Sequence, residues 1–161
     1  MGREILVRVA DFKAGSADDV LVTLGLGSCV GIALLDREAR VGGLAHILLP
    51  SPSLSRIHDN EAKFPQTAIP ALVSDMNGLG ADRRRLTARL IGGASMFASL
   101  APPGSVQMGE RNLVATRQVL SGLGIPVTGE AVGGDFGRSV RFLVGDGRIE
   151  IRTVTHGDRL L

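Results

Sequence analysis

The single cysteine of this chain, Cys29, is the residue best suited to nucleophilic chemistry. It ends the run Thr23-Leu24-Gly25-Leu26-Gly27-Ser28-Cys29, in which two glycines precede the thiol. Glycine allows backbone conformations closed to other residues, so this run can expose a sulfur and direct N–H groups around Gly27 and Ser28 toward a substrate oxygen. Ser28 is the rival nucleophile, although a hydroxyl is harder to activate near neutral pH. The structural alternative is a buried cysteine that opens a strand.

A catalytic thiol needs a base, and His46 is the first candidate. Two apolar, β-rich runs separated by a short polar turn predict an antiparallel hairpin around it. If Asp36 pairs with Val41, Cys29 falls opposite Leu48, and His46 becomes its diagonal neighbour on the same face, roughly 7 Å away. A slip of one residue would turn His46 to the other face. The alternative is a core histidine whose ring nitrogens are satisfied by neighbours.

Thr23 is the candidate third member of the site, six positions before the cysteine on a predicted strand. Its hydroxyl can bond one ring nitrogen of His46 and leave the other nitrogen facing the sulfur. An ordinary strand threonine is the alternative. Because a hydroxyl stabilises an imidazolium less than a carboxylate does, such a triad would be a modest catalyst, suited to slow modification of proteins.

Ordered sequence blocks resemble one known family over nearly the whole chain. The run that ends at Cys29, followed by Gly43-Leu44-Ala45-His46 and Leu49-Pro50, resembles the bacterial chemoreceptor glutamine deamidases of the CheD family. Further blocks follow in family order: Ile91-Gly92-Gly93-Ala94-Ser95-Met96-Phe97, Met108-Gly109-Glu110-Arg111-Asn112, Gly122-Leu123-Gly124-Ile125-Pro126, and Gly133-Gly134 through Arg138-Ser139-Val140. The chain departs from the family at Phe64-Pro65-Gln66 and at Asp135-Phe136, away from the triad candidates.

The resemblance implies a papain-like Cys-His pair with a threonine, carried by Cys29, His46 and Thr23. It implies hydrolysis of glutamine side chains to glutamate on methyl-accepting chemotaxis receptors, through a cysteine thioester and without a metal or organic cofactor. The expected substrate partner is the cytoplasmic helices of a receptor. The alternative function is a regulatory binding module for a CheC-type response-regulator phosphatase, with weak or secondary amidase or methylesterase activity.

Composition narrows the class of protein further. With 161 residues, 44% of them hydrophobic, the chain can bury one substantial core, so we expect one domain over residues 1–161, with roughly 155–161 as a tail. A net charge of +2, no Trp or Tyr and five Phe argue against nucleic acid binding. The lone thiol, and the lack of a signal-peptide core or of an apolar run that could span a bilayer, predict a cytoplasmic protein, monomeric alone.

The elements that would position these residues alternate between strands and a few helices. Glu110, Arg111 and Asn112 begin one helix, where capping or packing roles come before any catalytic role. Strands are predicted at 4–12, 20–24, 30–35, 41–49, 86–91, 125–132, 140–144 and 148–153, and helices at 67–79 and 109–123, with a long loop at 49–65. This mixture predicts an α+β fold, a single-domain layered sandwich of mostly antiparallel or mixed sheet with two main helices.

Overall fold

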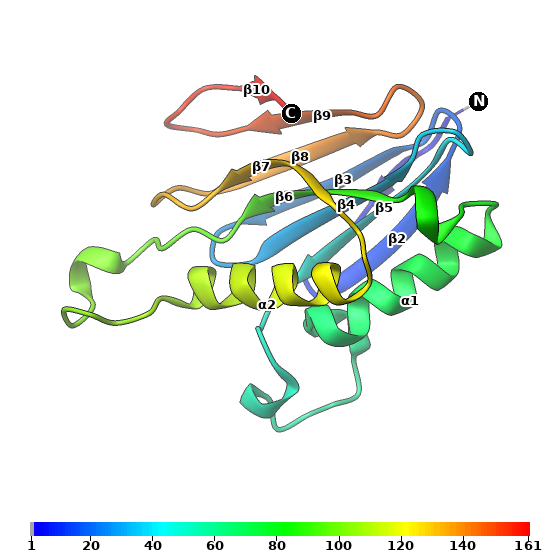
Figure 1. Ribbon diagram of the computed structural model, residues 1–161. Coiled ribbons are helices and arrows are strands. Elements are labelled where there is room, and N and C mark those ends of the chain that lie inside the picture. The colour runs from blue at the N-terminus through cyan, green and yellow to red at the C-terminus, as the bar shows by residue number, and fades with distance from the viewer. Residues whose placement is uncertain (1) are drawn as a thin grey trace.

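The computed structural model describes residues 2–161 and contains two five-stranded β-sheets and two α-helices (Figure 1). The outer sheet has the order β1 (Glu4–Leu6), β3 (Val20–Leu26), β8 (Arg138–Leu143), β9 (Arg148–Arg152) and β10 (Arg159–Leu160). The central sheet has the order β2 (Asp11–Ser16), β5 (Val41–Ile47), β4 (Val30–Asp36), β6 (Thr87–Gly92) and β7 (Val127–Val132). The helices are α1 (Pro65–Gly78) and α2 (Met108–Gly122).

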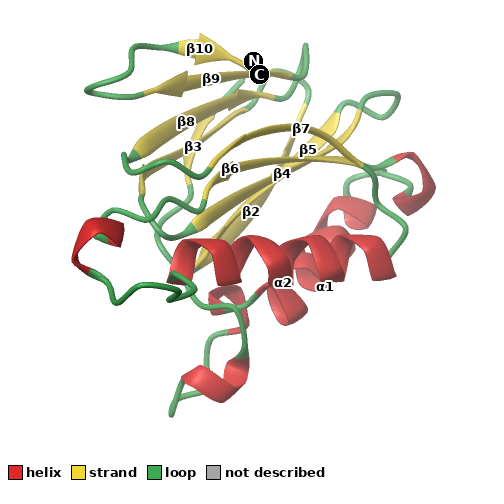
Figure 2. Ribbon diagram, turned by 60° about the vertical axis from the view of Figure 1, so that its left-hand side comes forward, coloured by secondary structure: helices red, strands yellow, loops and turns green. Residues whose placement is uncertain are grey.

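The molecule is built in three layers, with both helices on one face of the central sheet and the outer sheet on its other face (Figure 2). Each sheet is mixed, because β1 runs parallel to β3 and β6 runs parallel to β7, while the remaining pairs are antiparallel. The expected α+β layered sandwich with two helices is therefore confirmed.

The central sheet separates two apolar cores. Ile32 and Leu34 of β4 pack toward the helices, whereas Ala33 and Leu35 pack toward the outer sheet. Every residue of β4 and of β5 is buried, as expected of strands covered on both faces, so their sequences read as continuous apolar runs. The thin layer between the sheets also holds Cys29, which places the candidate nucleophile inside this second core.

The β4–β5 hairpin has the register that brings His46 and Cys29 to one face. Asp36 lies opposite Val41, and Gly31 lies opposite His46. Continuing this register by two residues puts Cys29 opposite Leu48, one diagonal from His46. Leu44, two residues before His46 on β5, belongs to the core between the sheets, so His46 faces the same layer as Cys29.

Two expectations about the ends of the chain are wrong. The strand predicted over 4–12 is two strands in different sheets, β1 and β2, because the chain turns between them at Ala10, which has φ +55°. The expected tail at 155–161 contains β10, which pairs antiparallel with β9, and Leu161 exchanges both backbone hydrogen bonds with Ile149. Pairing of a two-residue strand leaves no periodicity in sequence.

The middle of the chain shows smaller differences. The loop predicted at 49–65 carries two short 3-10 turns, Pro52–Leu54 and Glu61–Lys63. Helix α1 begins at Pro65, two residues before the prediction, so Pro70 lies inside the helix and not in its first turn. Pro70 there removes one main-chain hydrogen bond, and the buried residues of the helix, Ala68, Ile69, Leu72, Val73 and Met76, hold it against the central sheet.

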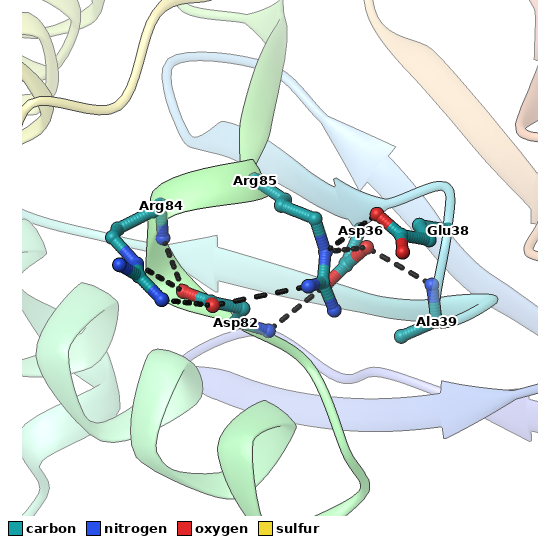
Figure 3. A network of polar contacts seen from close by, with 6 residues as sticks. All are labelled: Asp36, Glu38, Ala39, Asp82, Arg84 and Arg85. Carbon is teal, nitrogen blue, oxygen red and sulfur yellow. Dashed lines mark hydrogen bonds and ion pairs between the residues drawn. The ribbon is translucent and has the colours of Figure 1, made fainter.

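A buried carboxylate fixes the turn of the hairpin (Figure 3). Asp36 is fully buried and accepts hydrogen bonds from the backbone N–H groups of Ala39 (3.0 Å) and Asp82 (2.8 Å) and from the Arg85 guanidinium (2.9–3.1 Å). Burial alone would raise the pKa of Asp36, but the Arg85 hydrogen bond and the two amides outweigh it and hold this pKa below its usual value. The network therefore joins the hairpin to the segment that leads into β6.

Replacing Asp36 with Ala should lower the free energy of unfolding by about 2 kcal/mol or more, because two amides and a guanidinium lose their acceptor. Denaturant unfolding near neutral pH measures this loss. The Asp36 contribution should be present above the unfolded-state pKa of about 3.9 and vanish as the pH falls through the lower folded-state pKa. Glu38→Gln is the control, since the Glu38 side chain is 77% exposed. Equal losses from both variants would contradict this account of the hairpin turn.

Candidate active site

A hydrogen bond between the two sheets lies at the centre of the candidate site. Thr23 Oγ1 on β3 of the outer sheet is 2.7 Å from His46 Nδ1 on β5 of the central sheet, and both side chains are fully buried. The expected partnership of Thr23 and His46 is therefore present in the geometry. The two residues are 23 positions apart in the chain, and the packing of the two sheets brings them together.

The same threonine decides which nitrogen of His46 carries the proton. Thr23 Oγ1 also lies 2.7 Å from the carbonyl oxygen of Val7, which can only accept a hydrogen bond. A hydroxyl has one proton to donate, so Thr23 donates to Val7 and accepts from His46 Nδ1–H. Neutral His46 is then unprotonated at Nε2, the atom that a general base uses. Among residues 2–161, Nε2 is buried and has no hydrogen-bond partner.

Cys29 lies on the short connection that leaves β3 in the outer sheet and enters β4 in the central sheet. A β-bulge between Thr23 and Leu26 shifts the strand by one residue, so Thr23 and Leu26 both face the layer between the sheets. Gly25, with φ +70°, provides the bulge, whereas Gly27 has no positive φ. The result differs from the expected exposed sulfur, because Cys29 is only 9% exposed.

Burial sets the protonation of both side chains. Burial lowers the pKa of His46 to about 4. Burial also raises the pKa of the Cys29 thiol, an effect that its own backbone N–H opposes. At neutral pH the site therefore holds a neutral imidazole and a neutral thiol, in contrast to the charged pair of a strongly activated cysteine.

The backbone N–H groups expected to bind an oxyanion are open. Those of Gly27, Ser28 and Cys29 donate to no main-chain acceptor within the described part of the chain, and the Cys29 N–H lies beside its own sulfur. Ser28, the rival nucleophile, holds its carbonyl toward α2, where Asn112 Nδ2 donates to it at 2.9 Å. Neither of the other histidines joins the site: His58 Nε2 contacts the carbonyls of Pro52 and Ser55, and the ring of His156 stacks on Phe136.

Asn112 is the residue that sequence reasoning missed. Its side chain is fully buried, and Nδ2 also donates to the Leu48 carbonyl at 3.2 Å, just past His46. A capping or packing role was expected for Asn112, but its side chain also donates to the carbonyls of Ser28 and Leu48. The available signal was a polar residue on the buried face of α2, in the series Gly109, Asn112, Leu113, Thr116 and Leu120.

Comparison with known proteins gives the family. The family model described as CheD chemotactic sensory transduction matches residues 48–153. A relative from Caldanaerobacter subterraneus, named "Probable chemoreceptor glutamine deamidase CheD", is 44% identical over 94% of this chain and 93% of its own length. The chain belongs to the CheD family. A second CheD protein, from Desulfitobacterium hafniense and with the same name, is 42% identical over 100% of both chains.

The family-model match begins at residue 48 and does not include Thr23, Cys29 or His46. The match to the Desulfitobacterium hafniense protein covers the whole chain and therefore includes all three positions. A crystal structure of a Neisseria meningitidis protein of family DUF152 gives a TM-score of 0.46 at 13% identity, over 81% of this chain and 63% of that chain, and carries no part of the assignment. No helix within residues 2–161 of this CheD protein has the length and apolar character needed to cross a membrane.

The low pKa of His46 should make this CheD protein lose stability in mild acid. Between the ordinary pKa of 6.5 and the folded value of about 4, the unfolded chain takes up a proton that the folded chain excludes. The free energy of unfolding should therefore fall by roughly 3 kcal/mol as the pH drops through this range. Denaturant titrations at several pH values measure the loss, which His46→Leu should abolish and His58→Gln should leave in place. An unchanged pH dependence in His46→Leu would contradict the assignment.

Proposed function

We propose that this protein hydrolyses glutamine side-chain amides on methyl-accepting chemotaxis receptors, with Cys29 as nucleophile, His46 as general base and acid, and Thr23 as the residue that orients His46. The observation that carries the proposal is the unpartnered, unprotonated Nε2 of His46 on the same face of the hairpin as Cys29. Names of the relatives, which are chemoreceptor glutamine deamidases, supply the substrate class.

The reaction begins from the neutral pair. His46 Nε2 takes the Cys29 proton as the sulfur attacks the Cδ carbon of the glutamine amide, and the carbonyl oxygen becomes an oxyanion. The tetrahedral intermediate collapses to a thioester while His46 gives the proton to the departing ammonia. Water then loses a proton to His46 and attacks the thioester. Collapse of the second intermediate restores the Cys29 thiol and leaves a glutamate on the receptor.

The hydroxyl partner of His46 limits the rate of this chemistry. Protonated His46 is buried and is stabilised by a threonine oxygen, not by a carboxylate, so formation of the imidazolium is costly. The same intermediate can form from a methyl glutamate, which leaves methylesterase activity open to the site. A slow cytoplasmic enzyme that sets the modification level of a receptor fits these constraints.

Apolar side chains beside the nucleophile loop fit a helical protein substrate. Leu24 on β3 is 60% exposed, and Met96, which is 46% exposed, lies against Gly27. Phe97 follows it and is 72% exposed. An amphipathic receptor helix could lay its apolar face on these residues and present a glutamine to Cys29.

The same surface is open to a CheC-type phosphatase, which is the second candidate function. Binding of such a partner by a Cys29→Ala variant would show that this second role is independent of the thiol.

Replacing Cys29 with Ala should abolish deamidation while the fold is kept, because alanine removes only the sulfur. Incubation with receptor cytoplasmic fragments, followed by peptide mass spectrometry, detects the gain of about one dalton that converts an amide to an acid. Ser28→Ala is the matched control for the rival nucleophile and should retain activity. Activity that survives in Cys29→Ala and disappears in Ser28→Ala would reverse the assignment.

Replacing Thr23 with Val should lower kcat for deamidation by roughly 10- to 100-fold with little change in KM, since His46 loses the acceptor that fixes its tautomer. Valine matches threonine in shape, and Thr23→Ser keeps the hydroxyl, so the serine variant should be much the more active of the two. Initial rates over a range of receptor-fragment concentrations separate kcat from KM. Equal rates for the valine variant and the unchanged protein would remove Thr23 from the site.

A further inference from the structure

Three consecutive carbonyl groups of the nucleophile loop are each held by one donor. The Gly27 carbonyl accepts from Ala94 N–H at 2.8 Å, and the Cys29 carbonyl accepts from Gly93 N–H at 2.8 Å. The Ser28 carbonyl between them accepts from the side chain of Asn112 at 2.9 Å. The donors to Gly27 and Cys29 are main-chain groups of the turn that follows β6. The donor to Ser28 is the side chain of Asn112 on helix α2.

The turn after β6 approaches the nucleophile loop closely at Gly92. Gly92 has φ +101°, and a Cβ atom there would lie 2.5 Å from the Cys29 carbonyl oxygen. Only glycine therefore allows the turn to approach the loop so closely. A third main-chain donor is missing at Ser28, and the carboxamide of Asn112 takes that place.

Holding the Ser28 carbonyl also orients the Cys29 N–H, because the two belong to one peptide unit. A trans peptide is planar, and its C=O and N–H bonds point in opposite directions. With the carbonyl turned toward α2, the Cys29 N–H points to the other side of the loop, where it has no main-chain acceptor among the described residues and lies beside its own sulfur. This N–H is one of the groups around Cys29 proposed to bind the oxyanion.

Asn112 further connects the loop to the strand that carries His46. The same Nδ2 atom donates to the Leu48 carbonyl at 3.2 Å, two residues beyond His46. One buried carboxamide thus sets the position of the peptide beside Cys29 relative to the end of β5. Its own Oδ1 is buried without a partner in the described chain, so burial of Asn112 costs free energy that an apolar residue would avoid.

We infer that Asn112 is a positioning residue that orients the Cys29 N–H as an oxyanion donor, an assignment that rests on the proposed function of Cys29. Asn112 does not touch the substrate in this account. Its effect should therefore appear in steps that build a negative oxygen and be absent from steps that need only the thiol and its base.

Two reactions of the same sulfur separate these effects. Acylation of Cys29 by p-nitrophenyl acetate passes through a tetrahedral oxyanion and releases p-nitrophenolate. Alkylation by iodoacetamide displaces iodide from a saturated carbon and forms no oxyanion. Asn112→Leu keeps the size of the side chain and removes its donors. In this variant the acylation rate should fall about 10- to 100-fold, which is less than the loss expected when an oxyanion donor is removed altogether. The alkylation rate at the same pH should stay within about twofold, because it reports thiolate formation.

Thr116→Val is the matched control, since Thr116 is buried one turn along α2 and its hydroxyl has no partner among residues 2–161. This variant should change neither rate. If Asn112→Leu does not fold, Asn112→Ser, whose hydroxyl is too short to reach both carbonyls, takes its place. Equal losses in the two reactions, or no loss in either, would overturn the positioning role. Receptor deamidation by Cys29→Ala would instead contradict the proposed function, and the acylation-to-alkylation ratio would still report on Asn112.

Discussion

The hydrogen bond from His46 Nδ1–H to Thr23 Oγ1 is the interaction on which the candidate site depends. It joins the central sheet to the outer sheet in a layer filled mainly by apolar side chains, and the Thr23 hydroxyl donates a hydrogen bond to the Val7 carbonyl beyond β1. Three elements from two sheets therefore cooperate to hold one imidazole. The consequence is a single tautomer, with the basic lone pair at Nε2 and no competing partner for it within residues 2–161.

Burial determines the protonation states of His46 and Cys29. An imidazole with a pKa of about 4 and a thiol with a raised pKa are both neutral at rest, so in the proposed mechanism the charged pair forms during the reaction. The protein compensates with backbone geometry and not with side-chain charge. The loop that carries Cys29 is held by the turn after β6 and by Asn112, which fixes the N–H groups proposed to bind an oxyanion.

Local patterns in the sequence were enough to predict the hairpin but left its register open. The structure pairs Asp36 with Val41, the register in which side-chain parity puts Cys29 and His46 on one face. Thr23 followed from its place on a neighbouring strand and from the family resemblance. The division of 4–12 between two sheets, strand β10 and the contacts of Asn112 were missed. Each depends on long-range pairing: β10 is two residues long, and Asn112 contacts carbonyls 64 and 84 positions away.

The tautomer of His46 is the most direct test of the central claim, since every proposed step uses the lone pair at Nε2. Nitrogen-15 NMR of the imidazole in uniformly labelled protein near neutral pH distinguishes a protonated ring nitrogen from an unprotonated one. The account predicts a protonated Nδ1 and an unprotonated Nε2 for His46, and conversion to a mixture of tautomers in Thr23→Val. A proton found on Nε2 in the unchanged protein would contradict it, because His46 could then accept nothing from Cys29.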